Sequence, residues 1–269
     1  MYKLIALDMD GTLLTSDNKV SERNKKAIKA AEKKGVKVVL ASGRPSEGLR
    51  QYLEELELLK EDDYVLSFNG GVAQNAKSGE IISRTVLKGK DLKYINNIAK
   101  ELNVNIHAFS EKLGLITPKI SKYTEVEAEI NGIGISIVDF DNIDDTENII
   151  KVMIIDPEEV LEEAIKKLPK EVYEKYNVLR STPFFLEFMN NEVDKGEGLK
   201  RLAETLGIKQ EEVIAMGDAG NDLSMVKYAG LGVAMENGFA EVKENAQFIT
   251  KSNDEDGVAY AIEKFVLGE

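Results

Sequence analysis

The sequence predicts an α/β protein whose parallel-sheet core domain is interrupted by an inserted α+β domain. First, apolar runs of strand length alternate with amphipathic helical repeats near both ends of the chain. Second, this alternation stops between about Leu87 and Met189, where shorter and more polar strands favour antiparallel pairing. We therefore expect residues 1–84 and 189–269 to form the core domain, and residues 85–188 to form the inserted domain.

The chain opens with the strand around which the core is organised. Apolar residues from Leu4 to Leu7 run directly into Asp8, and Asp10 and Gly11 follow at once. An unbroken apolar run is typical of a strand buried on both faces of a parallel sheet. Because open α/β sheets bind ligands at the carboxyl ends of their strands, Asp8 and Asp10 are expected at the ligand edge. Two carboxylates this close repel each other, and a hard divalent cation such as Mg²⁺ would relieve the repulsion.

The same short pattern also has a plainer interpretation. Asp-x-Asp-Gly occurs in turns and in calcium-binding loops, so the two acids could do no more than stabilise a turn. An EF-hand loop that began at Asp8 would need a glutamate at its twelfth position, where this chain has Lys19. The calcium-loop interpretation is therefore disfavoured.

The next segment repeats the strand-and-helix pattern. Ser21 is a candidate N-cap for a helix that ends at Gly35, and a buried strand is predicted at 36–41. This strand ends in Ser42-Gly43-Arg44-Pro45, and the proline opens another helix. Ser42 should therefore reach the same sheet edge as Asp8, directly before a helix start that suits an anion. A serine in this position can equally be an N-cap with no further role.

The inserted domain is predicted from elements that do not follow the parallel pattern. The first core segment closes with a third strand at 64–68, which leads through Asn69-Gly70-Gly71 into a hairpin at 72–74 and 81–86. Beyond it we expect helices at 90–102, 119–130 and 157–168, and strands at 105–109, 114–117, 150–155, 178–182 and 185–189. His107 is the only histidine, and the chain has no cysteine to share a metal with it. It is therefore expected to be a half-buried strand residue.

The parallel pattern resumes near the end of the chain. Asp194-Lys195-Gly196 precedes an amphipathic helix, and a short buried strand at 213–216 runs into Gly217-Asp218-Ala219-Gly220-Asn221-Asp222. Acidic residues again follow a strand, and the glycines allow the backbone to approach a ligand closely. Late strands are expected at 231–235 and 247–250, and a final helix at 254–267.

Composition excludes several classes of function. The chain has 269 residues, and its 48 acidic against 35 basic residues give a net charge of −13. So acidic a protein is a poor binder of nucleic acid or of anionic membranes, and we expect neither as a partner. The absence of cysteine excludes disulfides and thiolate metal sites. No signal peptide or membrane-spanning run is recognisable, so we expect a cytoplasmic protein, either a monomer or a weak homodimer.

Four separate segments thus bring polar groups to the expected ligand edge of one sheet. They contribute Asp8 and Asp10, then Ser42, then Lys195, and finally Asp218, Asn221 and Asp222. Carboxylates can hold a metal, hydroxyl and amide groups can bind oxygens, and a lysine supplies positive charge. Together the set predicts a site for a phosphate group.

With these motifs in place, the chain resembles the haloacid dehalogenase-like (HAD) superfamily. DMDGTLL is similar to its first motif, ASGRP to the second, DKG to the third and GDAGND to the fourth, in the same order and over the whole chain. The insertion between the second and third motifs corresponds to the α+β cap of the Cof-type sugar-phosphate phosphatases. The resemblance implies a Rossmann-like core with an inserted cap, and a Mg²⁺-dependent phosphatase whose partner is a small phosphorylated metabolite.

The resemblance also implies roles for individual residues. Asp8 would be the nucleophile that forms an aspartyl-phosphate, and Asp10 the general acid and then base. Phosphate would be bound by Met9, Ser42, Gly43, Lys195 and Asn221. Arg44 and Asn69 are weaker candidates for contacts with the rest of the substrate. The metal would be held by Asp8, Asp10 through its carbonyl or carboxylate, Asp218 and Asp222, unless Asp222 instead orients Lys195.

Two alternatives stay open at this stage. Some relatives with a similar opening motif and cap are phosphohexomutases, which transfer phosphoryl groups between hydroxyls. A phosphate-binding or regulatory protein without turnover could also keep the fold. The complete set of motifs and the inserted cap favour the phosphatase over both.

Overall fold

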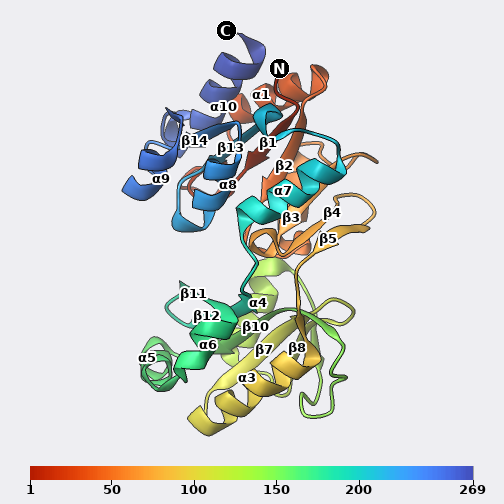
Figure 1. Ribbon diagram of the computed structural model, residues 1–269, viewed down its shortest axis with the longest axis vertical. Coiled ribbons are helices and arrows are strands. Elements are labelled where there is room, and N and C mark those ends of the chain that lie inside the picture. The colour runs from red at the N-terminus through yellow and green to blue at the C-terminus, as the bar shows by residue number, and fades with distance from the viewer. Residues whose placement is uncertain (269) are drawn as a thin grey trace. The chain divides into compact units, whose positions relative to one another are not determined.

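The chain folds into two compact units, and the computed structural model describes residues 1–268 (Figure 1). One unit contains Met1–Arg84 together with the segment that begins at Asp194, and the other contains Thr85–Val193. The first boundary coincides with the predicted one. The second falls at residue 193 rather than 188, because the last strand of the insertion, β12 (Phe185–Asn190), pairs along its length with neighbours in that unit.

The core unit is built on one eight-stranded sheet. The strands from β15 to β3 pair in parallel, and β4 and β5 extend the sheet as an antiparallel hairpin. In spatial order the strands are β15 (Phe248–Ile249), β14 (Leu231–Ala234), β13 (Val213–Gly217), β1 (Leu4–Leu7), β2 (Lys37–Ala41), β3 (Tyr64–Ser67), β4 (Val72–Asn75) and β5 (Ile81–Arg84). The α/β class is confirmed.

Helices cover both faces of this sheet, as the continuous apolar strands require. Side chains alternate along β1, so that Ile5 and Leu7 pack against one layer of helices while Leu4 and Ala6 pack against the other. The first layer contains α1 (Glu22–Lys33), α2 (Ser46–Glu55) and α10 (Gly257–Ile262), and the second contains α7 (Lys195–Thr205) and α8 (Leu223–Tyr228). A further short helix, α9 (Ala240–Asn245), follows β14 and was not predicted.

The inserted unit has a mainly antiparallel sheet, as expected for an α+β domain, in which only the edge pair of β8 and β9 is parallel among the described strands. Its strands, in spatial order, are β11 (Tyr176–Thr182), β12, β10 (Asn148–Ile155), β7 (Asn105–Ser110), β8 (Gly114–Thr117) and β9 (Ile135–Ile137), and β6 (Leu87–Lys88) pairs with β10. The helices α3 (Gly89–Leu102), α5 (Glu158–Lys167) and α6 (Lys170–Lys175) pack on one face. The short elements β6, β9 and α6 were not predicted.

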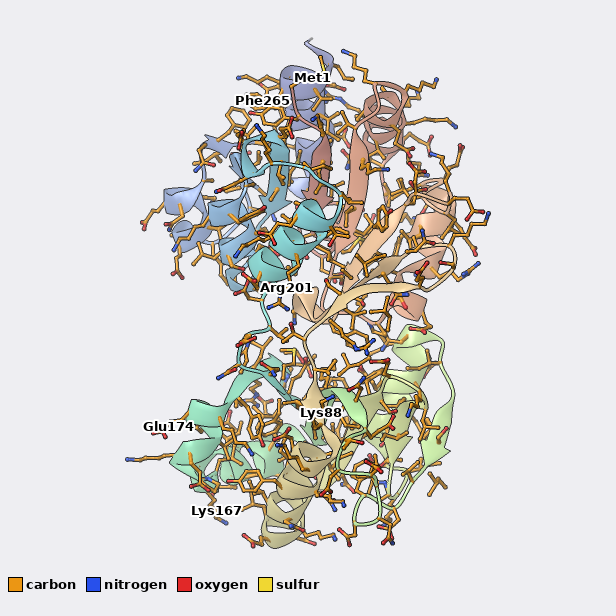
Figure 2. The ribbon with its side chains drawn as sticks, turned by 45° about the vertical axis from the view of Figure 1, so that its right-hand side comes forward. Met1, Lys88, Lys167, Glu174, Arg201 and Phe265 are labelled. Atoms are coloured by element: carbon orange, nitrogen blue, oxygen red, sulfur yellow. The ribbon has the colours of Figure 1, made fainter. Side chains whose placement is uncertain are left out.

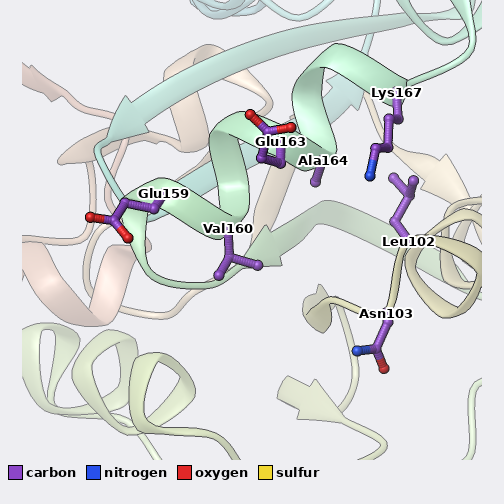
Figure 3. Close-up of a pocket in the computed structure, with 7 residues that line it drawn as sticks. All are labelled: Leu102, Asn103, Glu159, Val160, Glu163, Ala164 and Lys167. Carbon is purple, nitrogen blue, oxygen red and sulfur yellow. The ribbon is translucent and has the colours of Figure 1, made fainter.

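Charged side chains keep the surface of the inserted unit polar. Lys167 and Glu174 point outward from it (Figure 2). A surface pocket of about 350 Å³ lies between the end of α3 and α5 (Figure 3), where Glu159, Glu163 and Lys167 give it mixed charge. Among the described residues, none of the helices has the length and apolar character needed to cross a bilayer.

The other face of the inserted sheet carries an unexpected buried ionic cluster. Lys151 on β10 is 3% exposed and lies 3.2 Å from Glu187 of β12 and 3.8 Å from Glu127 of α4 (Lys122–Asn131). Ser181 also donates to Glu187, over 2.7 Å. His107, expected to be half-buried, is fully buried beside this cluster, and burial together with Lys151 lowers its pKa to about 3. It is therefore neutral.

Removing the lysine of this cluster should destabilise the inserted unit. Lys151→Met leaves two buried carboxylates without a cation, and we expect it to lower the free energy of opening of β10 and β12 by about 3 kcal/mol, measured by native-state hydrogen exchange. Lys166→Met, which removes an exposed lysine paired with Glu163 in the same unit, is the matched control and should have no measurable effect. Equal protection in the two variants would contradict this account.

Candidate active site

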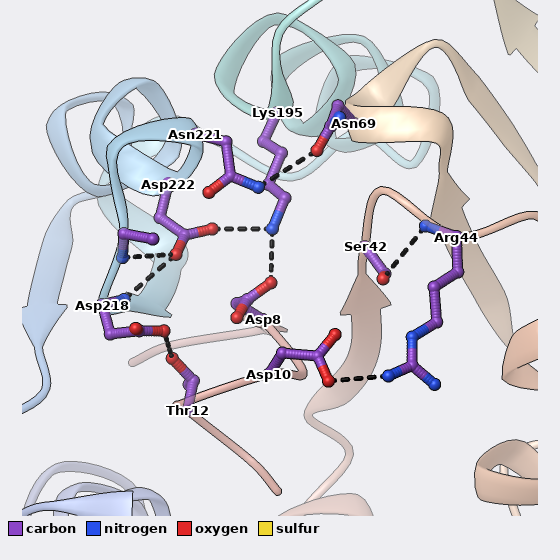
Figure 4. Close-up of polar contacts among 11 residues, drawn as sticks. Asp8, Asp10, Thr12, Ser42, Arg44, Asn69, Lys195, Asp218, Asn221 and Asp222 are labelled. Carbon is purple, nitrogen blue, oxygen red and sulfur yellow. Dashed lines mark hydrogen bonds and ion pairs between the residues drawn. The ribbon is translucent and has the colours of Figure 1, made fainter. Parts of the chain in front are cut away.

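The polar residues predicted from the sequence lie on loops at the carboxyl ends of adjacent parallel strands. Asp8–Thr12 follow β1, Ser42–Arg44 follow β2, and Asp218–Asp222 follow β13, while Lys195 is the first residue of α7. Because β13, β1 and β2 are neighbours in the sheet, residues more than two hundred positions apart meet at one place (Figure 4). This is the edge where open α/β sheets bind ligands.

Lys195 is the positive centre of the site. Its side chain is fully buried, and its Nζ is hydrogen-bonded to Asp8 Oδ1 and lies 2.7 Å from Asp222 Oδ1 (Figure 4). Burial alone would lower the pKa of this amine, but the two carboxylates outweigh it and raise the pKa above its ordinary value. Lys195 is therefore a fixed ammonium group.

Asp8 lies in a setting that resists ionisation. Burial raises the pKa of its carboxyl group to about 8, although the ammonium of Lys195 opposes the shift. Asp222 and Asp218 add to the rise through charge repulsion. A carboxylate must be ionised to act as a nucleophile, so further positive charge beside Asp8 would favour its reactive form.

Asp222 acts as a structural anchor for the loop. Its Oδ1 accepts from Lys195, and its Oδ2 accepts from the backbone N–H groups of Asp218 and Ala219, each over 3.0 Å. A side chain at Gly217 would collide with it, since a Cβ there would lie 2.3 Å from the Cβ of Asp222. With both oxygens engaged by donors, Asp222 fits the orienting role better than the predicted role of metal ligand.

Asp218 is held beside the acid-bearing turn after β1. Thr12 donates to Asp218 Oδ1 over 2.8 Å, a contact that the sequence analysis missed. Gly11 has φ of +82°, and a Cβ there would lie 2.5 Å from Asp218 Oδ2, so only glycine lets the turn approach so closely. Burial raises the pKa of Asp218, with the Thr12 hydrogen bond opposing the shift. In the sequence, the hint of this contact is the threonine that directly follows Asp8-Met9-Asp10-Gly11.

The acids form a cluster that suits a hard divalent cation. One ligand oxygen from each of Asp8, Asp218 and Asp222 lies within 4.8 Å of the others. Since Asp222 is engaged by three donors, Asp8 and Asp218 are the carboxylates best suited to bind Mg²⁺. Among the described residues, the Asp10 carboxylate is not part of this cluster.

Asp10 points toward a different partner. Its carboxylate forms an ion pair of 2.6 Å with Arg44, and its side chain is 58% exposed. This ion pair joins the loops after β1 and β2, and within the second loop the Arg44 backbone N–H donates to Ser42 Oγ over 3.2 Å. An exposed acid next to a buried one is available to exchange protons with a bound ligand or with water.

The predicted phosphate-binding groups surround this acid pair. Ser42 is 2% exposed, and the side chain of Met9 is buried in the core, so only the Met9 backbone could contact a ligand. Asn221 Nδ2 donates to Asn69 Oδ1 over 3.1 Å, and Asn69 also packs against Gly43. The structure thus brings every predicted site residue to this edge of the core sheet, and adds Thr12.

Comparison with known proteins agrees with this geometry. The sequence model of the haloacid dehalogenase-like hydrolases matches residues 5–262. The chain is 44% identical over 271 residues to a Bacillus subtilis protein with the curated name "Putative phosphatase YxeH", and the match covers 100% of both. It is 33% identical to the 5-amino-6-(5-phospho-D-ribitylamino)uracil phosphatase YcsE of the same organism, over 98% of this chain and 96% of the other.

Solved structures give the same result at the level of the fold. A haloacid dehalogenase-like hydrolase from Bacteroides thetaiotaomicron superimposes with a TM-score of 0.86 at 37% identity, covering 98% of this chain and 99% of the other. The subclass IIB sugar phosphatase BT4131 superimposes with a TM-score of 0.78 at 25% identity, covering 98% of each chain.

Proposed function

The chain belongs to the haloacid dehalogenase-like hydrolase family, and on this basis we propose that it is a Mg²⁺-dependent phosphatase of small phosphate monoesters. The observation that carries the proposal is the buried Asp8 carboxylate, held by Lys195 and flanked by Asp218. A nucleophile, a fixed cation and a candidate metal cluster at one sheet edge are the parts that phosphoryl transfer requires.

The first proposed step is attack of an Asp8 oxygen on the phosphorus of the ester. The bond from phosphorus to the ester oxygen breaks, an aspartyl-phosphate forms, and Asp10 gives its proton to the leaving oxygen. Lys195 reduces the repulsion between the attacking carboxylate and the anionic phosphate. When bound, Mg²⁺ would add positive charge opposite the phosphoryl oxygens.

The second proposed step is hydrolysis of that acyl phosphate. Asp10, deprotonated after the first step, accepts a proton from water while the water oxygen attacks phosphorus and the Asp8–phosphorus bond breaks. Its exposed position and its ion pair with Arg44 suit such a change of role. Ser42 and Asn221 would hold phosphoryl oxygens in both steps, and Asp222 keeps Lys195 in place.

The substrate class follows from the relatives rather than from a particular pocket. Two relatives bear names of enzymes that hydrolyse a phosphorylated ribityl compound or a sugar phosphate. We therefore propose small polyol or sugar phosphates as substrates of this chain. The net charge of −13 disfavours polyanionic substrates such as nucleic acid.

Phosphate release from a panel of compounds tests the proposal. Sugar phosphates, a ribitol phosphate, nucleotides and an aryl phosphate are each incubated with the purified chain, with Mg²⁺ or with a chelator. We expect release from at least one small ester, reduced about 100-fold or more by the chelator and restored by added Mg²⁺. Equal release with chelator would contradict the metal requirement. Absence of release from every compound by a folded, metal-loaded chain would contradict the phosphatase assignment.

A further inference from the structure

A strained turn after β3 contacts most of the groups expected to bind phosphate. Phe68, Asn69 and Gly70 follow β3 and have φ of 52°, 55° and 82°. Non-glycine residues rarely adopt positive φ, and a bulky residue such as phenylalanine does so least readily. Such strain persists only where the surrounding structure imposes it, often at a functional site.

Asn69 makes three contacts, each with a different predicted phosphate ligand. Its backbone N–H donates to the carbonyl of Ser42 over 2.9 Å. Its carboxamide packs against Gly43, where a Cβ would lie 3.2 Å from both Oδ1 and Nδ2. Its Oδ1 accepts from Asn221 Nδ2 over 3.1 Å, across 152 residues of sequence (Figure 4). One 7%-exposed side chain thus links the loops after β2 and β13.

The same turn also contacts the helix that carries the lysine. A Cβ at Gly70 would lie 2.4 Å from the carbonyl oxygen of Asp194 and 3.0 Å from the Cα of Lys195. The backbone there is therefore in close contact with the first turn of α7. Hydrogen bonds and packing of this kind fix the relative positions of groups that bind one small anion.

We propose that Asn69 is a positioning residue, which fixes Asn221 and the Ser42–Gly43 backbone so that together they bind the phosphoryl oxygens. This rests on the proposed phosphatase function. The acceptor Oδ1 determines which way the Asn221 amide faces, and the flat carboxamide limits movement of the Gly43 backbone. Asn69 itself acts through these neighbours and need not touch the reacting atoms.

The chain offers a test that separates the side chain from the backbone strain. Asn69→Gly removes the carboxamide but suits positive φ, so relief of backbone strain offsets part of the lost contacts and the variant should still fold. We expect kcat to fall about 10- to 100-fold and the Kd for inorganic phosphate in the presence of Mg²⁺, measured by calorimetry, to rise roughly tenfold. Asn69→Asp keeps an acceptor for Asn221. It should keep kcat within about threefold but raise KM about tenfold, because its charge repels phosphate.

Asn103 supplies the matched control. It also has positive φ, 54°, but it ends α3 in the inserted unit. Asn103→Gly makes the same chemical change in the same backbone conformation, and it should leave kcat, KM and the phosphate Kd unchanged. Wild-type kcat and Kd in Asn69→Gly, or equal losses in Asn103→Gly, would overturn the proposal. If the parent binds phosphate but hydrolyses no ester, the proposed function fails, whereas the comparison of Kd values still decides the role of Asn69.

Discussion

Asp8→Asn is expected to reduce phosphate release by on the order of 10⁴-fold, because the amide cannot attack phosphorus as a carboxylate does. The fold should stay intact. Asparagine has nearly the same size, and it removes a carboxyl group whose ionisation is disfavoured by burial. The measurement is steady-state release from the best substrate of the panel, with the unfolding transition followed in parallel.

A matched variant makes this result interpretable. Asp17→Asn makes the same change at an exposed residue on the same loop and should keep full activity. An Asp8→Asn protein that retained more than a few per cent of the parent rate would remove Asp8 as the nucleophile. An unfolded Asp8→Asn protein would instead contradict our account of how burial and charge balance at this position.

Lys195→Met is expected to have the second largest effect, on both activity and stability. Methionine fills a similar volume but leaves the buried Asp8 and Asp222 without the cation that both contact. Breaking a buried ion pair by removing one partner costs about 3–5 kcal/mol, and loss of the charge that offsets repulsion between Asp8 and phosphate should reduce kcat roughly 10³-fold. Denaturant unfolding and steady-state kinetics measure the two effects.

A second substitution separates these two effects. Lys195→Met with Asp222→Asn removes the carboxylate of Asp222 that the lost lysine would otherwise leave unpaired, so part of the lost stability should return while activity stays low. Recovery of activity in the double variant would mean that Lys195 acts only as a counter-ion for Asp222. Full stability of Lys195→Met alone would mean that the two carboxylates are not charged in the folded state.

The core domain could be predicted well from the sequence, because its strands are apolar runs and polar residues of the site follow these strands directly. Asp8, Ser42 and Asp218 each directly follow a strand, so their meeting at one edge followed from the parallel order. Lys195 could be assigned to this edge of the sheet only because Asp194-Lys195-Gly196 resembles the third motif of the family. As the first residue of a helix it has no local signal that distinguishes it from a surface lysine.

The contacts within the site could not be predicted in the same way. The ion pair between Asp10 and Arg44 and the bond between Asn69 and Asn221 join residues on different loops, and side-chain direction at a loop depends on tertiary packing. The sequence likewise left two roles open for Asp222, as a metal ligand or as a residue that orients Lys195. Only the structure reveals that its oxygens accept hydrogen bonds from two backbone N–H groups and from Lys195, which favours the orienting role.

The inserted unit was less predictable for a different reason. Its missed elements β6, β9 and α6 have only two, three and six residues, which is too short for a usable periodicity. Lys151 lies in an otherwise apolar strand and was accepted as an ordinary strand residue. Its buried ionic partners come from β12 and α4, which local sequence cannot indicate.

Chemical trapping of the aspartyl-phosphate is the most direct test of the central claim. Enzyme mixed with its best substrate is quenched within the first turnover and reduced with borohydride, which converts an acyl phosphate to the corresponding alcohol, and the peptide containing Asp8 is analysed by mass spectrometry. Our account predicts that residue 8 is converted to homoserine in proportion to the substrate bound, and that Asp10 and Asp17 are unchanged. Rapid phosphate release with no modification at residue 8, or modification at another residue, would contradict it.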